Sequence, residues 1–167
     1  MAAEIINGKY DLDLPLAREE GLPNLKGAKI KLIFADHAGN ADQGAAEATR
    51  LIEQEKAVAL IGAYNSSVTT QASQSAEAAG VPFLNPESTA ASLTQRGFKW
   101  FFRTTADDTI FVQNFFDFLA DLQSTKGVSP SSLAVVYENS SFGTGVGLLE
   151  MQVAPQAGWT VAADVAS

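Results

Sequence analysis

The sequence predicts an α/β fold whose neighbouring strands run parallel. Two short apolar runs, residues 59–62 and 81–84, have the length of strands, and each precedes a hydroxyl-rich loop and an alanine-rich helical stretch. The loops lie at residues 64–67 and 87–89. Because consecutive strands joined by a crossover helix lie parallel and usually side by side, both loops are expected at the same carboxyl edge of one sheet.

Elements before the first loop are predicted from spacing and from residues that break regular structure. Residues 2–6 have the pattern of a helix end stopped by an Asn-Gly pair, and an irregular connection follows over residues 9–26. The apolar run at residues 29–34 predicts a buried strand. Apolar residues at helical spacing predict the next helix over residues 42–55.

The two strand–loop–helix units continue the alternation. After a strand that begins at Val58, a helix is predicted over residues 69–79, with Gly80 at its end. A second helical segment at residues 90–96 precedes a strand at residues 99–103. Serine and threonine at the helix starts are expected to supply N-cap oxygens.

A long amphipathic helix is predicted over residues 107–122, where apolar side chains recur at offsets of four, three and four. The residues at this spacing are Phe111, Phe115, Phe118 and Leu122. Phenylalanines of this region are interpreted as core rather than as an aromatic ligand box. They are Phe101, Phe102, Phe111, Phe115, Phe116 and Phe118.

The last part of the chain predicts one further βαβ unit. Residues 127–132, rich in Gly, Ser and Pro, are the best linker candidate. A strand, a helix and a strand follow, over residues 133–137, 145–155 and 160–165. A lone βαβ unit leaves sheet edges uncovered, so we expect a first domain over residues 1–127 and the start of a second over residues 128–167.

Composition and charge limit the classes of function. A formal net charge of −8 at pH 7 and a pI near 4.5 argue against nucleic acid or an anionic membrane as the main partner. Without cysteine there is no thiol catalysis, thiolate metal site or disulfide. No apolar run approaches the roughly 20 residues of a membrane helix, and the chain starts without the layout of a leader peptide, so any leader is expected to lie outside it.

Catalytic and cofactor motifs are weighed and set aside. Glycines at 143, 145 and 147 follow a strand but have the wrong spacing for a dinucleotide site, so they are interpreted as easing entry into a helix. His37, the only histidine, has no sequence neighbours that complete a metal site or a catalytic dyad. Asp107 and Asp108 precede a helix and are interpreted as stabilising its N-terminus. The sequence therefore predicts no enzyme, no metal and no cofactor.

The two hydroxyl-rich loops are the candidate binding site. Helix starts offer free N–H groups and a positive dipole end, and nearby hydroxyls add donors, so the loops suit a carboxylate. The alternative is that their serines and threonines only cap helices. Two such loops on neighbouring strands favour a site for a small carboxylate.

Longer runs around these loops carry a family resemblance. Residues 61–67 read Ile-Gly-Ala-Tyr-Asn-Ser-Ser, residues 80–89 read Gly-Val-Pro-Phe-Leu-Asn-Pro-Glu-Ser-Thr, and residues 102–105 read Phe-Arg-Thr-Thr. Leu-Thr-Gln-Arg-Gly-Phe stands at 93–98 and Phe-Gly-Thr-Gly at 142–145. In order and spacing these runs resemble the substrate-binding proteins of branched-chain amino-acid type ABC transporters.

The resemblance implies the type I periplasmic binding fold, in which two doubly wound α/β lobes with mainly parallel sheets close over a ligand by hinge motion. Ser66, Ser88 and Thr89 match positions that hold the ligand's carboxylate, and the carbonyl of Glu87 matches one that accepts from an α-ammonium group. Tyr64 and Phe142 match the cleft walls. The residues predicted to bind ligand are Tyr64, Ser66, Ser67, Glu87, Ser88, Thr89 and Phe142.

Two departures from the family pattern bear on the ligand. Phe142 lacks the hydroxyl of the tyrosine that is common at its position, and Glu87 places an acid where small residues are usual. An aromatic carboxylate is therefore an alternative to an aliphatic amino acid, and the rings of Tyr64 and Phe142 would suit it.

The resemblance also implies that the chain is part of a longer protein. It would hold a first lobe without its first strand, and one βαβ unit of the second lobe. In the family that first strand lies between the strand at residues 29–34 and the one that begins at Val58. We therefore expect these two strands to pair directly, or to borrow a strand from a second copy in a strand-swapped homodimer.

The sequence thus predicts a non-enzymatic solute-binding component of an ABC importer, located in the periplasm or otherwise outside the cytoplasm. The full-length protein would bind a small carboxylate and an ABC permease, and no nucleic acid. A ligand-sensing domain of a regulator or receptor with the same fold is the first alternative. An α/β enzyme, such as an amide hydrolase or a nucleotide-dependent enzyme, is the second.

Overall fold

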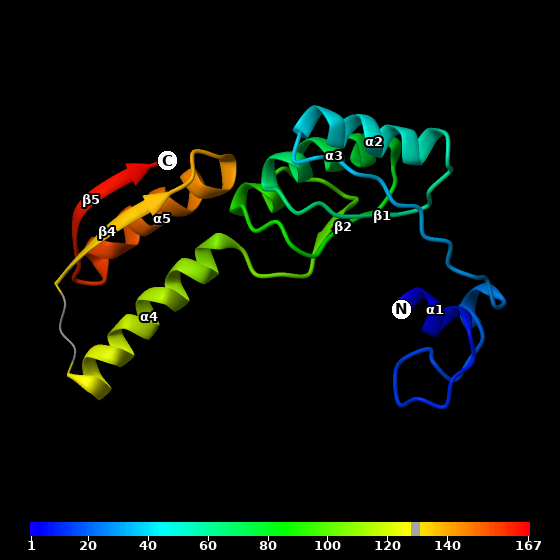
Figure 1. Ribbon diagram of the computed structural model, residues 1–167, viewed down its shortest axis with the longest axis horizontal. Helices are drawn as coiled ribbons and strands as arrows, with labels where there is room; N and C mark the ends of the chain where they lie inside the picture. Colours follow the sequence, from blue (N-terminus) through cyan, green and yellow to red (C-terminus); the bar gives the residue numbers. More distant parts are fainter. Residues whose placement is uncertain (128–130) are drawn as a thin grey trace. The chain divides into compact units, whose positions relative to one another are not determined.

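The computed structural model describes residues 1–127 and 131–167 (Figure 1). Two compact units divide the chain, residues 1–35 and residues 36–167. The predicted linker at residues 127–132 falls mainly on residues 128–130, which lie outside the described residues. Among the described helices, none is long and apolar enough to cross a membrane.

The first unit is built around one short helix. Helix α1 (Ala2–Asn7) ends before Gly8, as predicted, and a single 3₁₀ turn, η1 (Pro23–Leu25), lies in the irregular stretch that follows. The Asn7 side chain ties the helix to the end of the unit. It donates to the carbonyl and accepts from the amide of Ile30, both at 2.6 Å.

The predicted strand at residues 29–34 is wrong. These residues form no strand, and Phe34 is 85% exposed. Within the described residues β1 (Leu60–Ile61) has one neighbour, β2 (Phe83–Asn85), so the predicted direct pairing of residues 29–34 with the strand that begins at Val58 is also wrong. An apolar run becomes a buried strand only when other strands flank it, and within the described part of the chain no strand pairs with this run.

The second unit contains a three-stranded parallel sheet. Strand β2 lies between β1 and β3 (Phe101–Arg103) and pairs with both in parallel. The parallel order confirms that the chain leaves β1 and β2 at the same edge of the sheet. The strands are short, and β1 begins two residues later than the prediction at Val58.

Two helices lie side by side next to this sheet (Figure 1). Helix α2 (Ala41–Glu53) begins after Asn40, whose side chain accepts from the Gln43 amide at 2.9 Å. Helix α3 (Ser66–Ala79) ends at Gly80, which has a φ of 68° and so takes the left-handed conformation predicted for a helix end. The buried core that joins helices and sheet consists of Ala48, Leu60, Ala72, Ala76 and Phe83.

The expected serine and threonine caps are wrong at both helix starts. Asn65 precedes α3, Ala90 precedes η2 (Ala91–Thr94), and neither makes a side-chain cap. The second helical segment is only this 3₁₀ turn, so a full α-helix follows the first loop but not the second.

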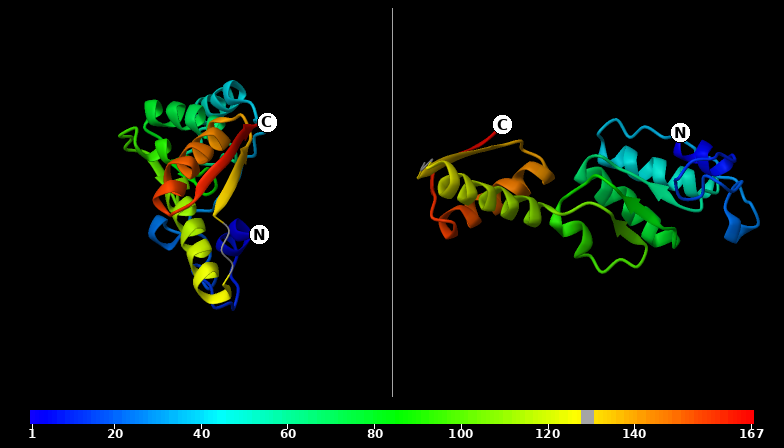
Figure 2. Two further views of the ribbon diagram at one scale, coloured as in Figure 1. Left: turned by 90° about the vertical axis from the view of Figure 1, so that its left-hand side faces the viewer. Right: turned by 90° about the horizontal axis from the view of Figure 1, so that it is seen from below.

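The last part of the chain folds as predicted into one βαβ unit. Strands β4 (Ser132–Tyr137) and β5 (Thr160–Ala166) pair in parallel, with α5 (Ser141–Gln156) between them in sequence. Helix α4 (Asp108–Lys126) lies beside α5 (Figure 2). The core between them consists of Val112, Phe116, Ala154 and Trp159.

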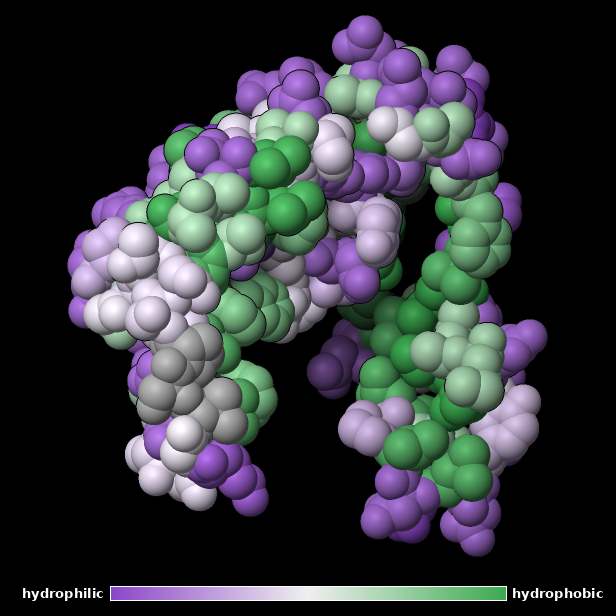
Figure 3. All heavy atoms as spheres, turned by 60° about the vertical axis from the view of Figure 1, so that its left-hand side comes forward, coloured by the Kyte–Doolittle hydropathy of each residue, from purple (hydrophilic) through white to green (hydrophobic). Residues whose placement is uncertain are grey.

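The buried face of α4 differs from the prediction. Val112 and Phe116 enter the core, whereas Phe111, Phe115 and Phe118 are exposed. Apolar side chains that reach the surface are visible as green spheres in Figure 3. An apolar spacing fixes which residues share a helix face, but the neighbours present decide which face is covered, and here α5 covers the Val112–Phe116 face.

Two of the three glycines predicted to ease entry into a helix, Gly143 and Gly147, lie within α5 and allow close packing. The helix begins four residues before the predicted start, because the side chain of Ser140 accepts from the Gly143 amide at 3.1 Å. A Cβ at Gly143 would lie 2.2 Å from the carbonyl oxygen of Glu138, and a Cβ at Gly147 would lie 2.6 Å from the Tyr137 ring. Any side chain at these two positions would therefore push α5 away from β4.

Candidate functional site

The loops after β1 and β2 are joined by a buried network of hydroxyl groups. Ser88 Oγ lies 2.6 Å from Thr69 Oγ1 and 2.7 Å from the carbonyl oxygen of Ala63. The Ala90 amide donates to Ser66 Oγ at 3.4 Å. The structure thus brings together the two loops that the sequence predicts to share one site.

Asn85, which the sequence analysis did not single out, shapes the second loop. Its side chain is fully buried. Its Oδ1 accepts from the amides of Glu87 at 3.1 Å and Ser88 at 2.9 Å, and its Nδ2 donates to the Ser88 carbonyl at 2.7 Å. A polar residue as the last residue of an apolar strand is the sequence signal that could have identified it.

The hydroxyls of Ser66 and Ser88 are not presented to solvent, in contrast to the expectation from the sequence. Ser66 is 3% and Ser88 2% exposed, and the hydroxyl and amide of Ser88 are used within the protein. Both hydroxyls hold the loops together because buried polar groups need partners. The part of these two positions in ligand binding stays a prediction.

Less buried residues of the site lie beside this network. Ser67 and Thr89 are half-buried, Glu87 is exposed, and Tyr64 is 73% exposed. Within the part of the chain that the structure describes, the Ser67 hydroxyl has no hydrogen-bond partner. The start of α3 has no side-chain cap, so its first amides, from Ser66 to Val68, point out of the helix without an intrahelical acceptor.

Phe142 is the predicted site residue that the structure does not bring to the two loops. It lies in the first turn of α5 and is exposed. Among the described residues it makes no ring contact or hydrogen bond with either loop. Its role as a cleft wall therefore stays a prediction.

A cluster of charged residues lies behind the second loop. Arg103, at the end of β3, forms an ion pair with Asp107 at 3.2 Å. Asp107 Oδ1 accepts from the Ile110 amide at 3.2 Å, which confirms the prediction that this residue stabilises the start of α4. Asp108 is buried, and its amide donates to the Thr89 carbonyl at 3.0 Å.

Burial raises the pKa of the Asp108 carboxyl above its ordinary value of 3.8, although a hydrogen bond with Thr89 and the charge of Arg103 act in the opposite direction. The folded protein therefore holds this proton more tightly than the unfolded chain. The protonated Asp108 carboxyl therefore contributes stability that is fully present below the pKa of the unfolded chain. This stability is lost as pH rises through the pKa of the folded protein.

Asp108→Asn should therefore gain stability relative to the wild type as pH rises. Asparagine cannot ionise, so the variant escapes the cost of a buried carboxylate. Urea unfolding of both proteins at about pH 4 and about pH 7 measures the difference, and comparison with the wild type cancels the other titrating groups. A difference that is the same at both pH values, or that moves the other way, contradicts the prediction.

Arg96 is a second, half-buried cation, and its role is structural. Its guanidinium donates to the Thr70 carbonyl at 3.0 Å and to Ser73 Oγ at 2.9 Å, and its carbon centre lies 4.1 Å from the centroid of the Phe98 ring. Burial lowers the pKa of this arginine. Arg96 thus joins the 3₁₀ turn after the second loop to α3.

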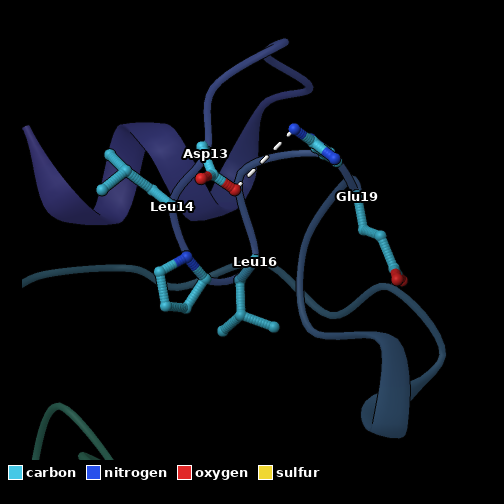
Figure 4. A pocket seen from close by; sticks show the side chains of 6 residues that line it. Asp13, Leu14, Leu16 and Glu19 are labelled. Atoms are coloured by element: carbon cyan, nitrogen blue, oxygen red, sulfur yellow. Dashed lines mark ion pairs between the residues drawn. The ribbon is translucent and has the colours of Figure 1, made fainter.

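Two hollows in the surface lie outside the loops. One of about 400 Å³ is lined by residues 13–16, 18 and 19 of the first unit, where Arg18 lies 3.8 Å from Asp13 (Figure 4). Both of those side chains are exposed, and ion pairs of this kind contribute little. The other, about 290 Å³, lies between η2 and α5, with Asp108 in its lining. Among the described residues there is no group of acidic or histidine side chains that could hold a metal.

Comparison with known proteins places this chain in a family. The family described as periplasmic binding protein matches residues 14–167. An amino acid binding protein of Pseudomonas aeruginosa is 34% identical over 122 residues, which are 73% of this chain and 31% of that protein. Leu/Ile/Val-binding protein homolog 8 of Brucella abortus is 31% identical over 158 residues, which are 90% of this chain and 38% of the relative.

Solved structures show the same fold. An ABC transporter substrate-binding protein from Desulfitobacterium hafniense, in complex with Leu, has a TM-score of 0.73 and 25% identity, over 85% of this chain and 41% of that protein. The substrate-binding protein LivJ from Streptococcus pneumoniae, in complex with isoleucine, has a TM-score of 0.69 and 22% identity, over 85% of this chain and 38% of the other.

This chain spans less than half the length of the relatives it matches. Those relatives are named as binding proteins, and the fold they share is the type I periplasmic binding fold, an α/β architecture with parallel sheets. The family match covers nearly the whole chain. The parallel β1-β2-β3 sheet and the βαβ unit after it agree with this classification. The chain belongs to the periplasmic binding protein family.

Proposed function

We propose that this chain is part of a solute-binding component of an ABC importer and supplies one side of a site for an amino acid or a related small carboxylate. The names of its relatives support this, since they include amino acid and Leu/Ile/Val-binding proteins. The full-length protein would act outside the cytoplasm, close on its ligand by hinge motion and deliver it to a membrane permease.

The observation that carries the proposal is the uncapped start of α3. The first loop leads directly into this 14-residue helix, and the amides of Ser66, Ser67 and Val68 lack intrahelical partners. These donors and the positive end of the helix dipole suit a carboxylate. By contrast, side chains cap the starts of α2, α4 and α5.

The second loop adds to this site from the neighbouring strand. The hydrogen bond between Ala90 and Ser66 holds it beside the start of α3, and its Thr89 is half-buried next to that bond. The carbonyl of Glu87 would accept from an α-ammonium group, while the exposed ring of Tyr64 would contact the ligand's side chain. Phe142 would complete the site when the lobes close.

The division of the chain into a first lobe over residues 1–127 and the start of a second lobe over residues 128–167 is part of this proposal, although α4 shares its core with α5. Exchange of a strand between two copies stays a prediction. Size-exclusion chromatography with light scattering tests it, and a monomer at all concentrations would contradict it.

Leucine should bind this chain weakly through its carboxylate. Because most of the opposing lobe lies outside the chain, we expect a dissociation constant of about 1 mM or weaker. This corresponds to a binding free energy of about 4 kcal/mol or less. Calorimetry at modest leucine concentration should therefore detect no heat of binding. In a titration followed by NMR, the amide signals of Ser66, Ser67 and Thr89 should move. Benzoate tests the aromatic alternative in the same way.

Two controls make the titration decisive. Leucinamide has the same side chain and ammonium group but no carboxylate, so it should leave these amides unmoved. Ser67→Ala should weaken leucine binding severalfold through loss of one donor, whereas Ser75→Ala, further along α3, should not. Equal shifts with leucinamide, or none with leucine and benzoate, would overturn the proposal.

A further inference from the structure

The arginine of the Phe-Arg-Thr-Thr run lies buried behind the second loop. Its side chain is 7% exposed. Nη1 donates to the carbonyl of Ala90 at 2.9 Å and to that of Thr89 at 3.3 Å. Nη2 donates to Asp107 at 3.2 Å and to the Thr94 hydroxyl at 3.4 Å. One guanidinium thus contacts the end of the second loop, the 3₁₀ turn after it and the start of α4.

The geometry of this contact requires arginine. A guanidinium is planar and presents its N–H groups as a rigid fork, so one side can bind two carbonyls while the other binds a carboxylate. A lysine ammonium is a point charge and cannot reach all of these acceptors at once. Asp107 balances the buried charge and at the same time caps α4.

A second bond closes the same junction. The amide of Asp108, in the first turn of α4, donates to the Thr89 carbonyl that Arg103 also contacts. Thr89 is therefore held from two sides, by the end of β3 and by the start of α4.

We propose that Arg103 is a positioning residue that fixes the second loop, and with it the Thr89 amide, against the first turn of α4. This inference rests on the proposed function, since it assigns Arg103 a role in the same site. Arg103 does not touch the ligand. It acts by keeping the Thr89 amide at a constant distance from the uncapped start of α3.

Amide hydrogen exchange without ligand tests the positioning. Arg103→Met keeps most of the apolar stem and removes the guanidinium. We expect the amides of Ala90 and Asp108 to exchange at least about tenfold faster than in the wild type, while the Leu60 amide, bonded to the Pro82 carbonyl, changes less than about twofold. Equal acceleration of all three, or of none, overturns the proposal.

Two further variants separate the fork from its charge. In Arg103→Lys a cation remains for Asp107, so the Ile110 amide should stay protected, but the Ala90 and Asp108 amides should remain fast. Full restoration of these two by lysine would show that charge alone suffices and would overturn the proposal. Arg50→Met, which removes an arginine of α2 with two surface ion pairs, is the matched control and should leave the second loop unchanged.

A leucine titration then links the positioning to binding. Arg103→Met should raise the dissociation constant severalfold relative to the wild type and to Arg50→Met. Faster exchange with unchanged leucine affinity would overturn the role in the site. If wild-type protein itself shows no leucine or benzoate shift, the proposed function fails, and the exchange experiment still decides whether Arg103 positions the loop.

Discussion

Asn85→Leu should lower the free energy of unfolding by about 3–5 kcal/mol, because the substitution keeps the branched shape of the side chain, adds bulk to a fully buried position and removes three hydrogen bonds. The amide and the carbonyl of Ser88 would stay buried without their partners, and each such group costs about 1–3 kcal/mol. Urea unfolding measures the loss as a lower midpoint with an unchanged slope.

Asn40→Ala is the matched control for this prediction. Asn40 also accepts from a backbone amide, but at the exposed start of α2, where a lost cap costs about 1 kcal/mol. If Asn85→Leu costs no more than Asn40→Ala, the second loop does not depend on the buried amide as described.

Phe116→Ala should lower the free energy of unfolding by about 3–5 kcal/mol, because it opens a cavity between α4 and α5. Phe116 is 2% exposed and packs with Val112, Ala154 and Trp159. Thermal or urea unfolding measures this loss of stability, which arises in the core that α4 shares with the βαβ unit.

Phe118→Ala makes the same chemical change on the same helix, at a side chain that is 56% exposed. Its effect should stay within about 0.5 kcal/mol. Similar costs for both variants would mean that a partner covers the exposed face of α4 in solution and would contradict the burial described for this helix.

The alternation of strands and helices could be predicted from the sequence wherever neighbours in the chain are also neighbours in space. The parallel order of β1, β2 and β3, the end of α3 at Gly80 and the final βαβ unit are all confirmed. Each depends on local spacing and on the rule that short crossovers join adjacent parallel strands.

The errors arose where a distant neighbour decides the outcome. Residues 29–34 are apolar enough for a buried strand, but a strand needs flanking strands that spacing along the chain does not reveal. The periodicity of α4 showed its apolar residues but not which face α5 covers. Glycines 143 and 147 reflect the closeness of Glu138 and of Tyr137 at the end of β4, which the glycine spacing alone does not show.

The meeting of the two loops could be predicted from the sequence, but not the contacts of their hydroxyl groups. Residue types located both loops at one sheet edge, whereas the direction of each hydroxyl depended on buried partners across the loops, such as Thr69 for Ser88. The roles of Asn85 and Arg103 were not predicted, because Asn85 bonds only backbone groups and Arg103 bonds two backbone carbonyls besides its side-chain partners, and a sequence does not show which backbone groups a side chain reaches.

Because Asn85 satisfies the backbone of the second loop from within, the loop has its shape before any solute arrives. Pre-organised receptors lose little conformational freedom on binding, so more of each new contact is expressed as affinity. Selectivity among solutes would then rest on the flexible, outward-facing groups around this rigid frame, such as the ring of Tyr64, and could change without disturbing the frame itself.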